Sequence, residues 1–334
     1  MTVQITILGM GQIGTSIGLA LAEHKELVLR VGHDKDIRIA NQAKQMGALD
    51  RVDINIPHAV EEAGLVVLAL PLDQVHQMLE VVGPCMKQGA VLINASPVQQ
   101  SVLGWAKELL PAGRYYIGLT PVINPVYLNE YQSGIEAARA DLFKNGLVAI
   151  VSPSGVPSEA IKLATDFSHL LGADHLFIDP LEVDSLMAAV HTLPQLLAEA
   201  LLEATVDQPG WREGRKLAGR PYAQVTGLSG QFSNPQALTS EALENREHII
   251  RLIDSINARL AELRNELYEQ DAEALTKRFT AARQGRERWL LERLRADWVA
   301  EETAPPVELP SAKEFFSRMI GFGRKPKSKT DKDN

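Results

Sequence analysis

Three closely spaced glycines near the start of the chain could bind a phosphate group. Gly9, Gly11 and Gly14 form a G-x-G-x-x-G turn between two apolar runs. In such a turn the first glycine permits a tight bend, the second lets the backbone approach a diphosphate, and the third lets a helix pack closely on a strand. The start of that helix offers free N–H groups and the positive end of its dipole to phosphates. We therefore expect this backbone, including Gln12 and Ile13, to bind a dinucleotide.

An acidic residue follows at the distance that a dinucleotide site requires. Asp34 lies 20 residues after Gly14, beyond the apolar run Leu27–Val31. A carboxylate there accepts hydrogen bonds from the ribose hydroxyls and repels a 2′-phosphate. The pattern predicts NAD rather than NADP as cofactor, although the neighbouring cations Lys35 and Arg38 weaken this preference. The alternative interpretation is a glycine turn that binds no ligand.

The first half of the chain alternates between apolar runs and helical patterns, which predicts a parallel sheet. The expected strands are residues 3–8, 27–31, 65–70, 90–94, 115–119, 147–151 and 175–178, and helices such as 74–82 and 101–109 separate most of them. The fold class is therefore α/β, with an N-terminal, doubly wound parallel sheet of the Rossmann type over residues 1–179. Ligands of such folds bind beyond the carboxyl ends of the strands.

That edge of the sheet also brings together polar residues. Leu70 and Pro71 end one strand and Asn94 ends the next, so we expect these three residues to contact the cofactor. Ser96 and Thr120 follow two strand ends and are candidate catalytic residues. Ser96 could donate a hydrogen bond, and Thr120 should line the pocket.

The second half of the chain is predicted to be helical. The expected helices are residues 182–206, 240–270 and 273–299. Pro194 lies inside the first and should kink it, because proline removes a backbone hydrogen bond. Apolar stripes on these helices predict an all-α dimerisation domain over residues 180–303, and hence a homodimer. Residues 304–334 are expected to form a linker and a disordered basic tail.

The composition argues against several classes of partner. The chain of 334 residues has a formal charge of −8, and residues 311–334 carry +4 (seven Lys or Arg against three Asp or Glu), so the rest carries −12. Such an acidic body argues against nucleic acid as a partner. The single Cys85 cannot form an internal disulfide, and we see no signal peptide, no apolar run of ~18 residues and no metal-ligand motif. We expect a cytoplasmic protein without a membrane span or a metal site.

Four segments of the chain carry a resemblance to a known family. They are residues 9–16, the strand ending at residues 69–71, residues 133–143, and the helix containing Leu193-Pro194 with residues 243–247 downstream. The third is specific, because Rossmann folds in general do not carry it. On these segments, from about residue 3 to about residue 265, the chain resembles the prephenate/arogenate dehydrogenase family. The resemblance implies a Rossmann domain, a helical domain that dimerises, and the NAD(P)-dependent oxidative decarboxylation of a cyclohexadienol carboxylate.

The chain departs from the family pattern at the substrate end. Thr120 occupies the position of the family's catalytic histidine. The family's Gly-Ser-Val-Lys is replaced by Ser96-Pro97-Val98-Gln99, so Pro97 occupies the position of its usual serine. Threonine cannot take up a proton near pH 7, and the loss of a general base typically costs ~10²–10⁴ in rate. The family's substrate-binding arginine has no clear match.

The long helix carries the remaining candidates. The family's Ser-His-x-Pro-His is replaced by His191-Thr192-Leu193-Pro194-Gln195, so the histidine has moved by one place, about 100° around a helix. His191 could replace the missing acid–base group from the opposite wall of the site, or it could only pack or cap elsewhere. Thr192 and Gln195 are candidate substrate-binding residues. Three hypotheses follow: the family reaction, a dehydrogenase of another small carboxylate, or a catalytically silent NAD-binding dimer.

Overall fold

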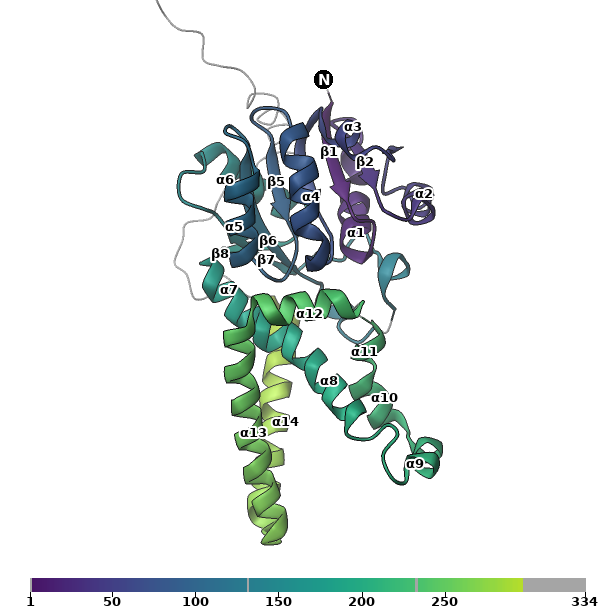
Figure 1. Cartoon of the computed structure of the whole chain (residues 1–334), viewed down its shortest axis with the longest axis vertical. Helices are drawn as coiled ribbons and strands as arrows, with labels where there is room; N and C mark the ends of the chain where they lie inside the picture. Colours follow the sequence, from purple (N-terminus) through teal and green to yellow (C-terminus); the bar gives the residue numbers. More distant parts are fainter. Residues whose placement is uncertain (1, 131, 232–233, 297–334) are drawn as a thin grey trace, which may run out of the picture.

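A computed structural model describes residues 2–130, 132–231 and 234–296 of the chain, which form a sheet domain and a helical domain. Eight strands make one sheet in the order β3-β2-β1-β4-β5-β6-β7-β8. The strands are β1 (Val3–Leu8), β2 (Val28–His33), β3 (Arg51–Val52), β4 (Ala63–Leu68), β5 (Val91–Asn94), β6 (Tyr115–Val122), β7 (Leu147–Val151) and β8 (Asp174–Phe177). Figure 1 shows the helical domain below this sheet, with α12 at the junction.

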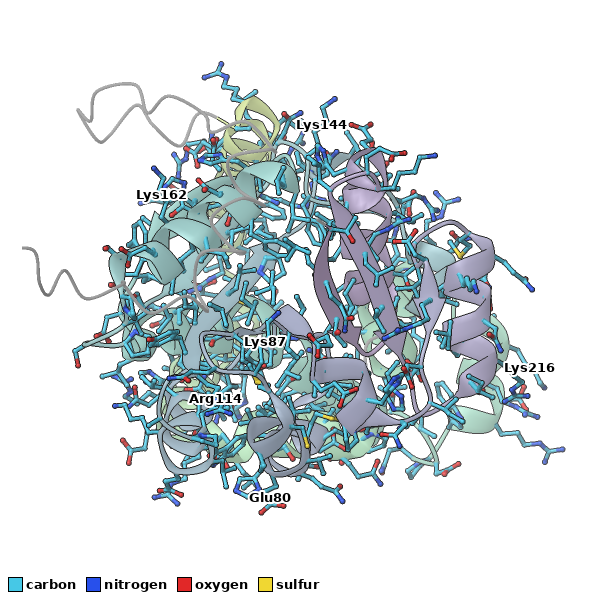
Figure 2. All side chains as sticks on the ribbon, turned by 90° about the horizontal axis from the view of Figure 1, so that it is seen from above. Glu80, Lys87, Arg114, Lys144, Lys162 and Lys216 are labelled. Atoms are coloured by element: carbon cyan, nitrogen blue, oxygen red, sulfur yellow. The ribbon has the colours of Figure 1, made fainter. Side chains whose placement is uncertain are left out.

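Helices cover both faces of the sheet, as a doubly wound fold requires. They are α1 (Gln12–Ala20), α2 (Ile37–Gln45), α3 (Ile56–Val60), α4 (Leu72–Cys85), α5 (Gln100–Leu109) and α6 (Ser158–Leu170), with short 3₁₀ turns η1 (Leu21–His24), η2 (Pro125–Tyr127) and η3 (Gly134–Ala137). Alternate residues of β1 serve two separate cores: Ile5 and Ile7 belong to one and Leu8 to the other. Charged side chains such as Glu80, Lys144 and Lys162 lie at the rim (Figure 2).

The predicted fold class is confirmed, but the sheet is not parallel throughout. β7 pairs antiparallel with β6, in the register Thr120 to Ala149. In its described residues, the connection between these strands contains two 3₁₀ turns and no crossover helix, and parallel strands need a crossover. β6 also extends past the end of β5, because Asn94 pairs with Gly118 and β6 continues to Val122. The end of β6 therefore projects toward the helical domain.

The helical domain begins with a long segment interrupted by one wide turn. Its elements are α7 (Pro180–Met187), the π-helical turn η4 (Ala188–Thr192), α8 (Leu193–Glu203), α9 (Trp211–Leu217), α10 (Arg220–Thr226), α11 (Leu228–Gln231), α12 (Pro235–Glu244), α13 (Arg246–Tyr268) and α14 (Ala272–Arg295). The irregularity expected at Pro194 takes the form of η4, directly before α8. The polar stretch 207–239, which carried no helix prediction, contains α9 to α11, and no residue of α9 or α10 is buried. Their lack of a buried face explains why no apolar stripe revealed them.

Helices α13 and α14 form an antiparallel pair that extends away from the sheet (Figure 1). Arg278 of α14 binds Glu266 at 2.6 Å and Glu262 at 3.1 Å on α13. The pair exposes Leu260 and Leu267 to solvent. These apolar side chains on a long helix are suited to contact with another protein surface.

One helical stretch in the described part of the chain, Pro180–Glu203, is long and apolar enough to cross a membrane by length and composition alone. About 28% of its most apolar window is buried inside the protein. The stretch is not one uninterrupted apolar run, since Asp184 and His191 lie within it. Residues 297–334, which include the predicted tail, lie outside the described residues.

Candidate functional site

The turn between β1 and α1 has the geometry of a phosphate cradle. Gly9 has a φ of +95°, and a Cβ there would collide with the carbonyl of Ala69. A Cβ on Gly14 would overlap the carbonyl oxygen of Gly9, whereas a Cβ on Gly11 would meet nothing within 4 Å. The first and third glycines are therefore required by close backbone packing. The second faces open space, which leaves room for a diphosphate to approach the backbone.

The first turn of α1 adds hydrogen-bond donors to this cradle. No side chain caps the helix at Gly11, so its first N–H groups are not satisfied by a cap. Gln12 and Ile13 are half-buried here, and Ile13 packs against the core while Gln12 donates to the carbonyl of Ala137 at 3.2 Å. The residues present thus fit a dinucleotide diphosphate.

The carboxylate of Asp34 is held beside the cradle. Its Oδ2 accepts a hydrogen bond from the backbone N–H of Met10 at 2.7 Å, and its Oδ1 accepts one from Asp36 at 2.9 Å. Each carboxylate oxygen retains a second lone pair, which a ribose hydroxyl could use. Arg38, one of the cations expected to weaken the preference for NAD, is paired with the carboxylate of Asp36 at 2.7 Å.

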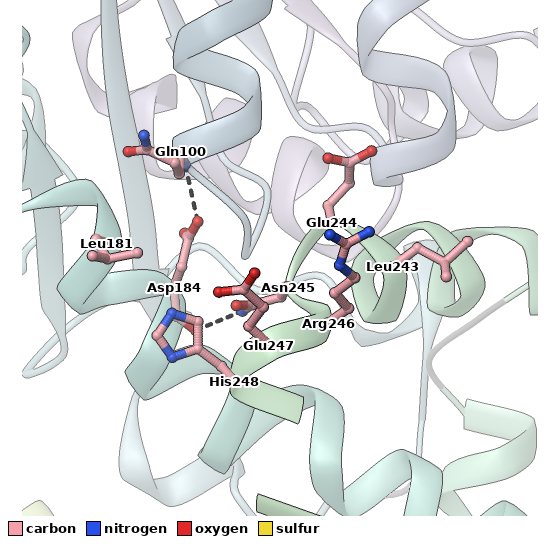
Figure 3. Close-up of a pocket in the computed structure, with 9 residues that line it drawn as sticks. All are labelled: Gln100, Leu181, Asp184, Leu243, Glu244, Asn245, Arg246, Glu247 and His248. Atoms are coloured by element: carbon pink, nitrogen blue, oxygen red, sulfur yellow. Dashed lines mark hydrogen bonds between the residues drawn. The ribbon is translucent and has the colours of Figure 1, made fainter. Parts of the chain in front are cut away.

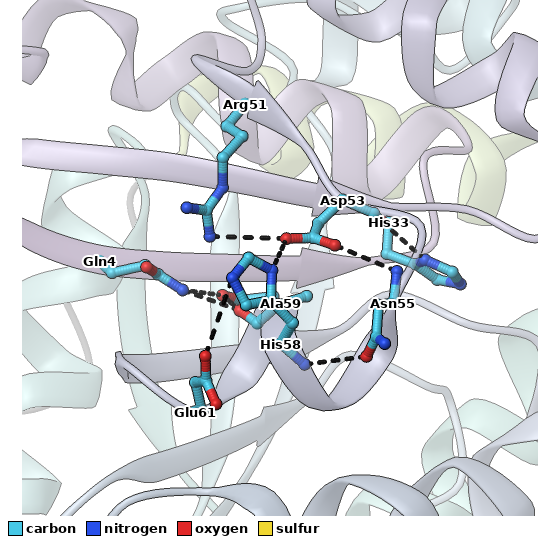
Figure 4. Close-up of polar contacts among 9 residues, drawn as sticks. Gln4, His33, Arg51, Asp53, Asn55, His58, Ala59 and Glu61 are labelled. Atoms are coloured by element: carbon cyan, nitrogen blue, oxygen red, sulfur yellow. Dashed lines mark hydrogen bonds and ion pairs between the residues drawn. The ribbon is translucent and has the colours of Figure 1, made fainter.

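A polar cluster supports the end of β2 next to Asp34 (Figure 4). Nδ1 of His33 contacts the carbonyl of Asp53 at 2.9 Å. The carboxylate of Asp53 accepts a hydrogen bond from the N–H of Asn55 at 3.0 Å and pairs with His58. These contacts connect the ends of β2 and β3 to α3, and so they fix the strand end that presents Asp34.

The segment 133–143, which carries much of the family resemblance, packs against α1. The N–H of Arg139 donates to Oγ of Ser16 at 3.0 Å, and Glu136 accepts from Gln42 of α2 at 2.6 Å. The segment therefore braces the two helices that follow β1 and β2.

Leu70, Pro71 and Asn94 lie at the carboxyl ends of β4 and β5, as expected for an α/β fold. Cδ2 of Leu70 would contact a Cβ on Gly9 at 2.9 Å, so this side chain adjoins the cradle. Pro71 precedes the first turn of α4. Asn94 is fully buried, and its Nδ2 donates to Oγ of Ser96 at 2.8 Å.

Gln99 organises the substrate end, and sequence reasoning did not single it out. Its Nε2 donates to the carbonyl of Ser96 at 2.7 Å and to Oγ1 of Thr120 at 3.0 Å. Its Oε1 accepts from the hydroxyl of Tyr116 at 2.9 Å, and a Cβ on Gly118 would collide with this oxygen. Gln99 is fully buried, and Thr120 is 3% exposed. The two positions where the family pattern has lysine and histidine are thus changed together, and the new side chains bind each other.

Two of the candidate catalytic residues are consequently enclosed in this network. Ser96 is 2% exposed, and its hydroxyl donates to the carbonyl of Val98 at 3.0 Å. Thr120 receives a hydrogen bond from Gln99 and lies 3.5 Å from the carbonyl of Ser96. Burial raises the pKa of the neighbouring Tyr116 hydroxyl far above its usual range. The cluster stays uncharged near neutral pH and provides no general base.

Asp184 of α7 connects the two domains at this point, and sequence reasoning did not single it out. Its Oδ1 accepts from the N–H of Gln99 at 2.6 Å and its Oδ2 from the N–H of Gln100 at 3.0 Å. Asn245 donates to the carbonyl of Asp184 at 2.6 Å. Burial raises the pKa of the Asp184 carboxyl above its ordinary value. A pocket of about 300 Å³, with Arg246 among its lining residues, adjoins this link (Figure 3).

His191 lies in η4 and faces a carboxylate of α12. Its Nε2 is 3.6 Å from Oε2 of Glu241, and Gln195 donates to the His191 carbonyl at 3.0 Å. Burial lowers the pKa of His191 and raises that of Glu241 to about 7, with a further contribution from Asp73 of α4. Thr192 is 1% exposed. His191 therefore lies beside α12, while Thr192 and Gln195 are buried in the same segment. Glu241 is a further residue here that sequence reasoning missed.

Within residues 2–130, 132–231 and 234–296, no three His, Cys, Asp or Glu side chains are grouped so that they could hold a metal ion.

Comparison with protein families identifies both domains. The prephenate dehydrogenase nucleotide-binding domain matches residues 17–176, and the prephenate dehydrogenase dimerization domain matches residues 179–281. The prephenate dehydrogenase of Bacillus subtilis is 23% identical over 285 residues, which are 85% of this chain and 75% of the relative. The cyclohexadienyl dehydrogenase of Zymomonas mobilis is 23% identical over 286 residues, which are 84% and 94% of the two chains.

Solved structures show the same fold. The prephenate dehydrogenase of A. aeolicus, in complex with hydroxyphenyl propionate and NAD+, gives a TM-score of 0.74 at 18% identity and covers 86% of this chain and 98% of its own. The arogenate dehydrogenase of Synechocystis gives 0.65 at 19% identity, with 86% and 99% covered. With both domains matched in order, the chain belongs to the prephenate dehydrogenase family.

Proposed function

We propose that this protein is an NAD-dependent dehydrogenase that oxidises and decarboxylates a cyclohexadienol carboxylate, prephenate or arogenate. The observation that carries the proposal is the cradle of Gly9, Gly11 and Gly14 with the carboxylate of Asp34 beside it, in a chain whose two domains both match the family. The relatives named prephenate, cyclohexadienyl and arogenate dehydrogenase support this substrate class.

The choice of NAD over NADP rests on Asp34. Its carboxylate would repel a 2′-phosphate, and Arg38, a neighbouring cation, is paired with Asp36. When bound, NAD supplies the hydride acceptor. The residues of the chain bind and orient the two reactants, and aromatisation of the ring after loss of CO₂ drives the reaction forward.

The protein is proposed to act as a homodimer through its helical domain. Its second domain is a dimerization domain of the family, and α13 exposes large apolar side chains such as Leu260 and Leu267. We propose that the protein spans no membrane, since Asp184 and His191 interrupt its one apolar helical stretch in the described residues, Pro180–Glu203.

The experiment that tests the function measures NAD binding and turnover separately. The purified protein is titrated with NAD, and nicotinamide reduction is then followed at 340 nm with prephenate or with arogenate. We expect binding, and turnover of at least one of the two compounds. Absence of NAD binding would refute the proposal as a whole.

A second function is favoured by one observation, the enclosure of the Thr120 hydroxyl by Gln99. A site whose former histidine position is occupied in this way could belong to a catalytically silent, NAD-binding dimer. Tight binding of NAD without turnover of either compound would support that second function. Turnover of a different small carboxylate would support the remaining alternative.

A further inference from the structure

A second cavity, in the sheet domain, has no role in the function proposed so far. It measures about 300 Å³ and is lined by α5, by the turn before β6, by the start of β6 and by residues 153–156 after β7. That loop reaches the start of β6 because β7 runs antiparallel to β6, with Val151 opposite Gly118. The cradle lies at the carboxyl ends of the parallel strands, so this cavity lies at the opposite edge of the sheet.

Most of the side chains around this cavity are apolar or aromatic. Leu103 and Ala106 of α5 belong to the same core as Tyr116 of β6, and all three line the cavity. The remaining apolar or aromatic lining residues are Leu110, Pro111, Ala112, Tyr115, Pro153 and Val156. Because small-molecule sites begin at about this volume and are lined mainly by such groups, the cavity fits a small apolar body.

The charged lining residues of the cavity are all cations. They are Lys107 of α5 and Arg114 of the turn before β6, and no Asp or Glu is among the lining residues. The cavity at the domain link is different, since Asp184, Glu244 and Glu247 line it. In a chain with a formal charge of −8, a cavity lined by cations without acids favours an anionic ligand.

Arg114 is fixed in place without losing its charge to a carboxylate. Its Nε and Nη2 donate to the carbonyl of Met86 at 3.0 and 2.8 Å, and its Nη1 donates to the carbonyl of Ala112 at 3.1 Å. A guanidinium has five N–H groups, so two of them remain for a ligand. Within the described residues, no carboxylate forms an ion pair with Arg114 or with Lys107. A cation that is already oriented in this way binds a carboxylate at a small entropic cost.

The wall of the cavity is in direct contact with the polar cluster at the substrate end. Tyr116 lines the cavity, and its hydroxyl donates to Oε1 of Gln99 at 2.9 Å. Nε2 of Gln99 in turn donates to Oγ1 of Thr120 at 3.0 Å. Two hydrogen bonds therefore connect the lining of the cavity to Thr120.

We propose that this cavity binds a small apolar molecule with a single carboxylate group. The apolar body packs against α5 and Tyr116, and the carboxylate pairs with Lys107 and Arg114. The position of Tyr116 then changes with occupation, and Gln99 transmits this change to Thr120. The site is separate from the cradle, and the inference goes beyond the proposed dehydrogenase function.

The first test titrates the purified full-length protein with hexanoate and follows the heat of binding. Hexanamide, which has the same apolar body without the charge, and acetate, which has the charge without the body, are the ligand controls. For a ligand of this size we expect a Kd of about 1 mM for hexanoate, and binding at least ~10-fold weaker for both controls.

The second test changes the charge of the cavity. Lys107 is exposed, so its substitution should leave the fold intact, which a thermal melt checks. We expect the Kd of hexanoate to rise about 3-fold in Lys107→Gln and about 10-fold in Lys107→Glu, because an attractive charge is first removed and then reversed. Lys144→Gln is the matched control, since Lys144 is also exposed and lies well away from Arg114 in Figure 2. It should bind hexanoate like the wild type.

The third test follows the methyl signal of Thr120 by NMR, identified as the signal missing from Thr120→Val. Saturation with hexanoate should shift this signal in the wild type. Tyr116→Phe keeps the ring that lines the cavity and removes the hydroxyl that bonds Gln99. This variant should bind hexanoate within about 2-fold of the wild type, while the shift of the Thr120 methyl is largely lost.

Each outcome decides one part of the proposal. Lack of hexanoate binding, or equal binding of hexanamide, would overturn the site. Wild-type affinity in Lys107→Glu would overturn it as well, because hexanoate would then bind elsewhere in the protein. A Thr120 signal that stays unmoved at saturation, or that moves equally in Tyr116→Phe, would overturn the connection through Gln99. All three tests are independent of NAD binding and turnover, so the dehydrogenase function and this site stand or fall separately.

Discussion

The nucleotide end and the substrate end of this protein keep to the family pattern to different degrees. At the nucleotide end, Gly9 and Gly14 are fixed by backbone contacts that no larger residue could tolerate. At the substrate end, Thr120 and Gln99 replace a histidine and a lysine and bind each other. No other residue can replace these two glycines, because every other residue has a Cβ that would collide with the backbone. A hydrogen-bonded cluster can instead be rebuilt from other polar residues if every group finds a partner.

The largest effect should come from adding one methyl group to the cradle. Gly11→Ala introduces a Cβ with no protein atom within 4 Å, so the fold should be unaffected, but the methyl group would block the diphosphate. A steric loss of about 3 kcal/mol corresponds to a ~100-fold higher Kd for NAD. Calorimetric titration with NAD, together with a thermal melt, measures both quantities.

Gly14→Ala is the informative counterpart. Its Cβ would overlap the carbonyl oxygen of Gly9, so the protein itself should lose about 1–3 kcal/mol of stability. Equal melting temperatures for the two variants would contradict the different roles assigned to these glycines.

The next effect concerns the pH dependence of stability at Glu241. With a folded pKa of about 7 against 4.5 in the unfolded chain, the folded state holds more protons between these values, so stability falls as pH rises through this window. At 1.36 kcal/mol per unit, Glu241→Gln should be roughly 3 kcal/mol more stable than the wild type at pH 8 and equally stable at pH 4. His191 acts oppositely below pH 6.5, because burial lowers its pKa.

Urea unfolding at pH 4, 6 and 8 measures this difference. A constant difference between the two proteins across this range would show that Glu241 is not desolvated in the way that the structure indicates.

A smaller loss of stability is expected for Thr120→Val, which tests whether the Thr120 hydroxyl supports the fold or contacts the substrate. Removing the hydroxyl leaves Nε2 of Gln99 with one partner fewer, at a cost of about 1–2 kcal/mol. Because the hydroxyl is enclosed, kcat should change less than threefold. A fall of 100-fold would mean that Thr120 contacts the substrate. Thr165→Val, on the distant helix α6, is a matched control for the loss of a threonine hydroxyl.

The smallest effect should appear in the choice of cofactor. Asp36→Asn releases Arg38 from its exposed ion pair, and such a pair is weak because solvent screens it. Binding of NADP should improve by a few-fold while binding of NAD is unchanged. No change in the affinity ratio would mean that Arg38 lies out of reach of the 2′-position.

The sequence was most informative where side chains are buried on both faces of a strand. Residues 3–8 and 147–151 were predicted with the observed bounds. The first were recognised as the strand that enters the glycine turn, and the second as a continuous apolar run, which marks a strand covered on both sides. The direction of β7 was wrong, since direction depends on the connection and not on the strand. The two-residue strand β3 is too short to carry any pattern.

The candidate site was predictable only where its geometry is local. The glycine turn and Asp34 lie within one strand–helix–strand unit, so their spacing was visible. Gln99, Asp184 and Glu241 acquire their roles through contacts between elements far apart in the chain, 85 residues in the case of Gln99 and Asp184. Polar residues of the same types also occur on the surface, and a single sequence does not show which of them are buried.

The bond between Asp184 and α5 has a mechanical consequence. The carboxylate of Asp184, on α7 of the helical domain, caps the first turn of α5 in the sheet domain. It accepts two hydrogen bonds, from the N–H groups of Gln99 and Gln100. Any hinge motion that separates the domains here must displace Gln99, whose side chain donates a hydrogen bond to Thr120. Separation of the domains and loosening of the Gln99–Thr120 contact are therefore one movement, and a ligand that restrains one of them will restrain the other.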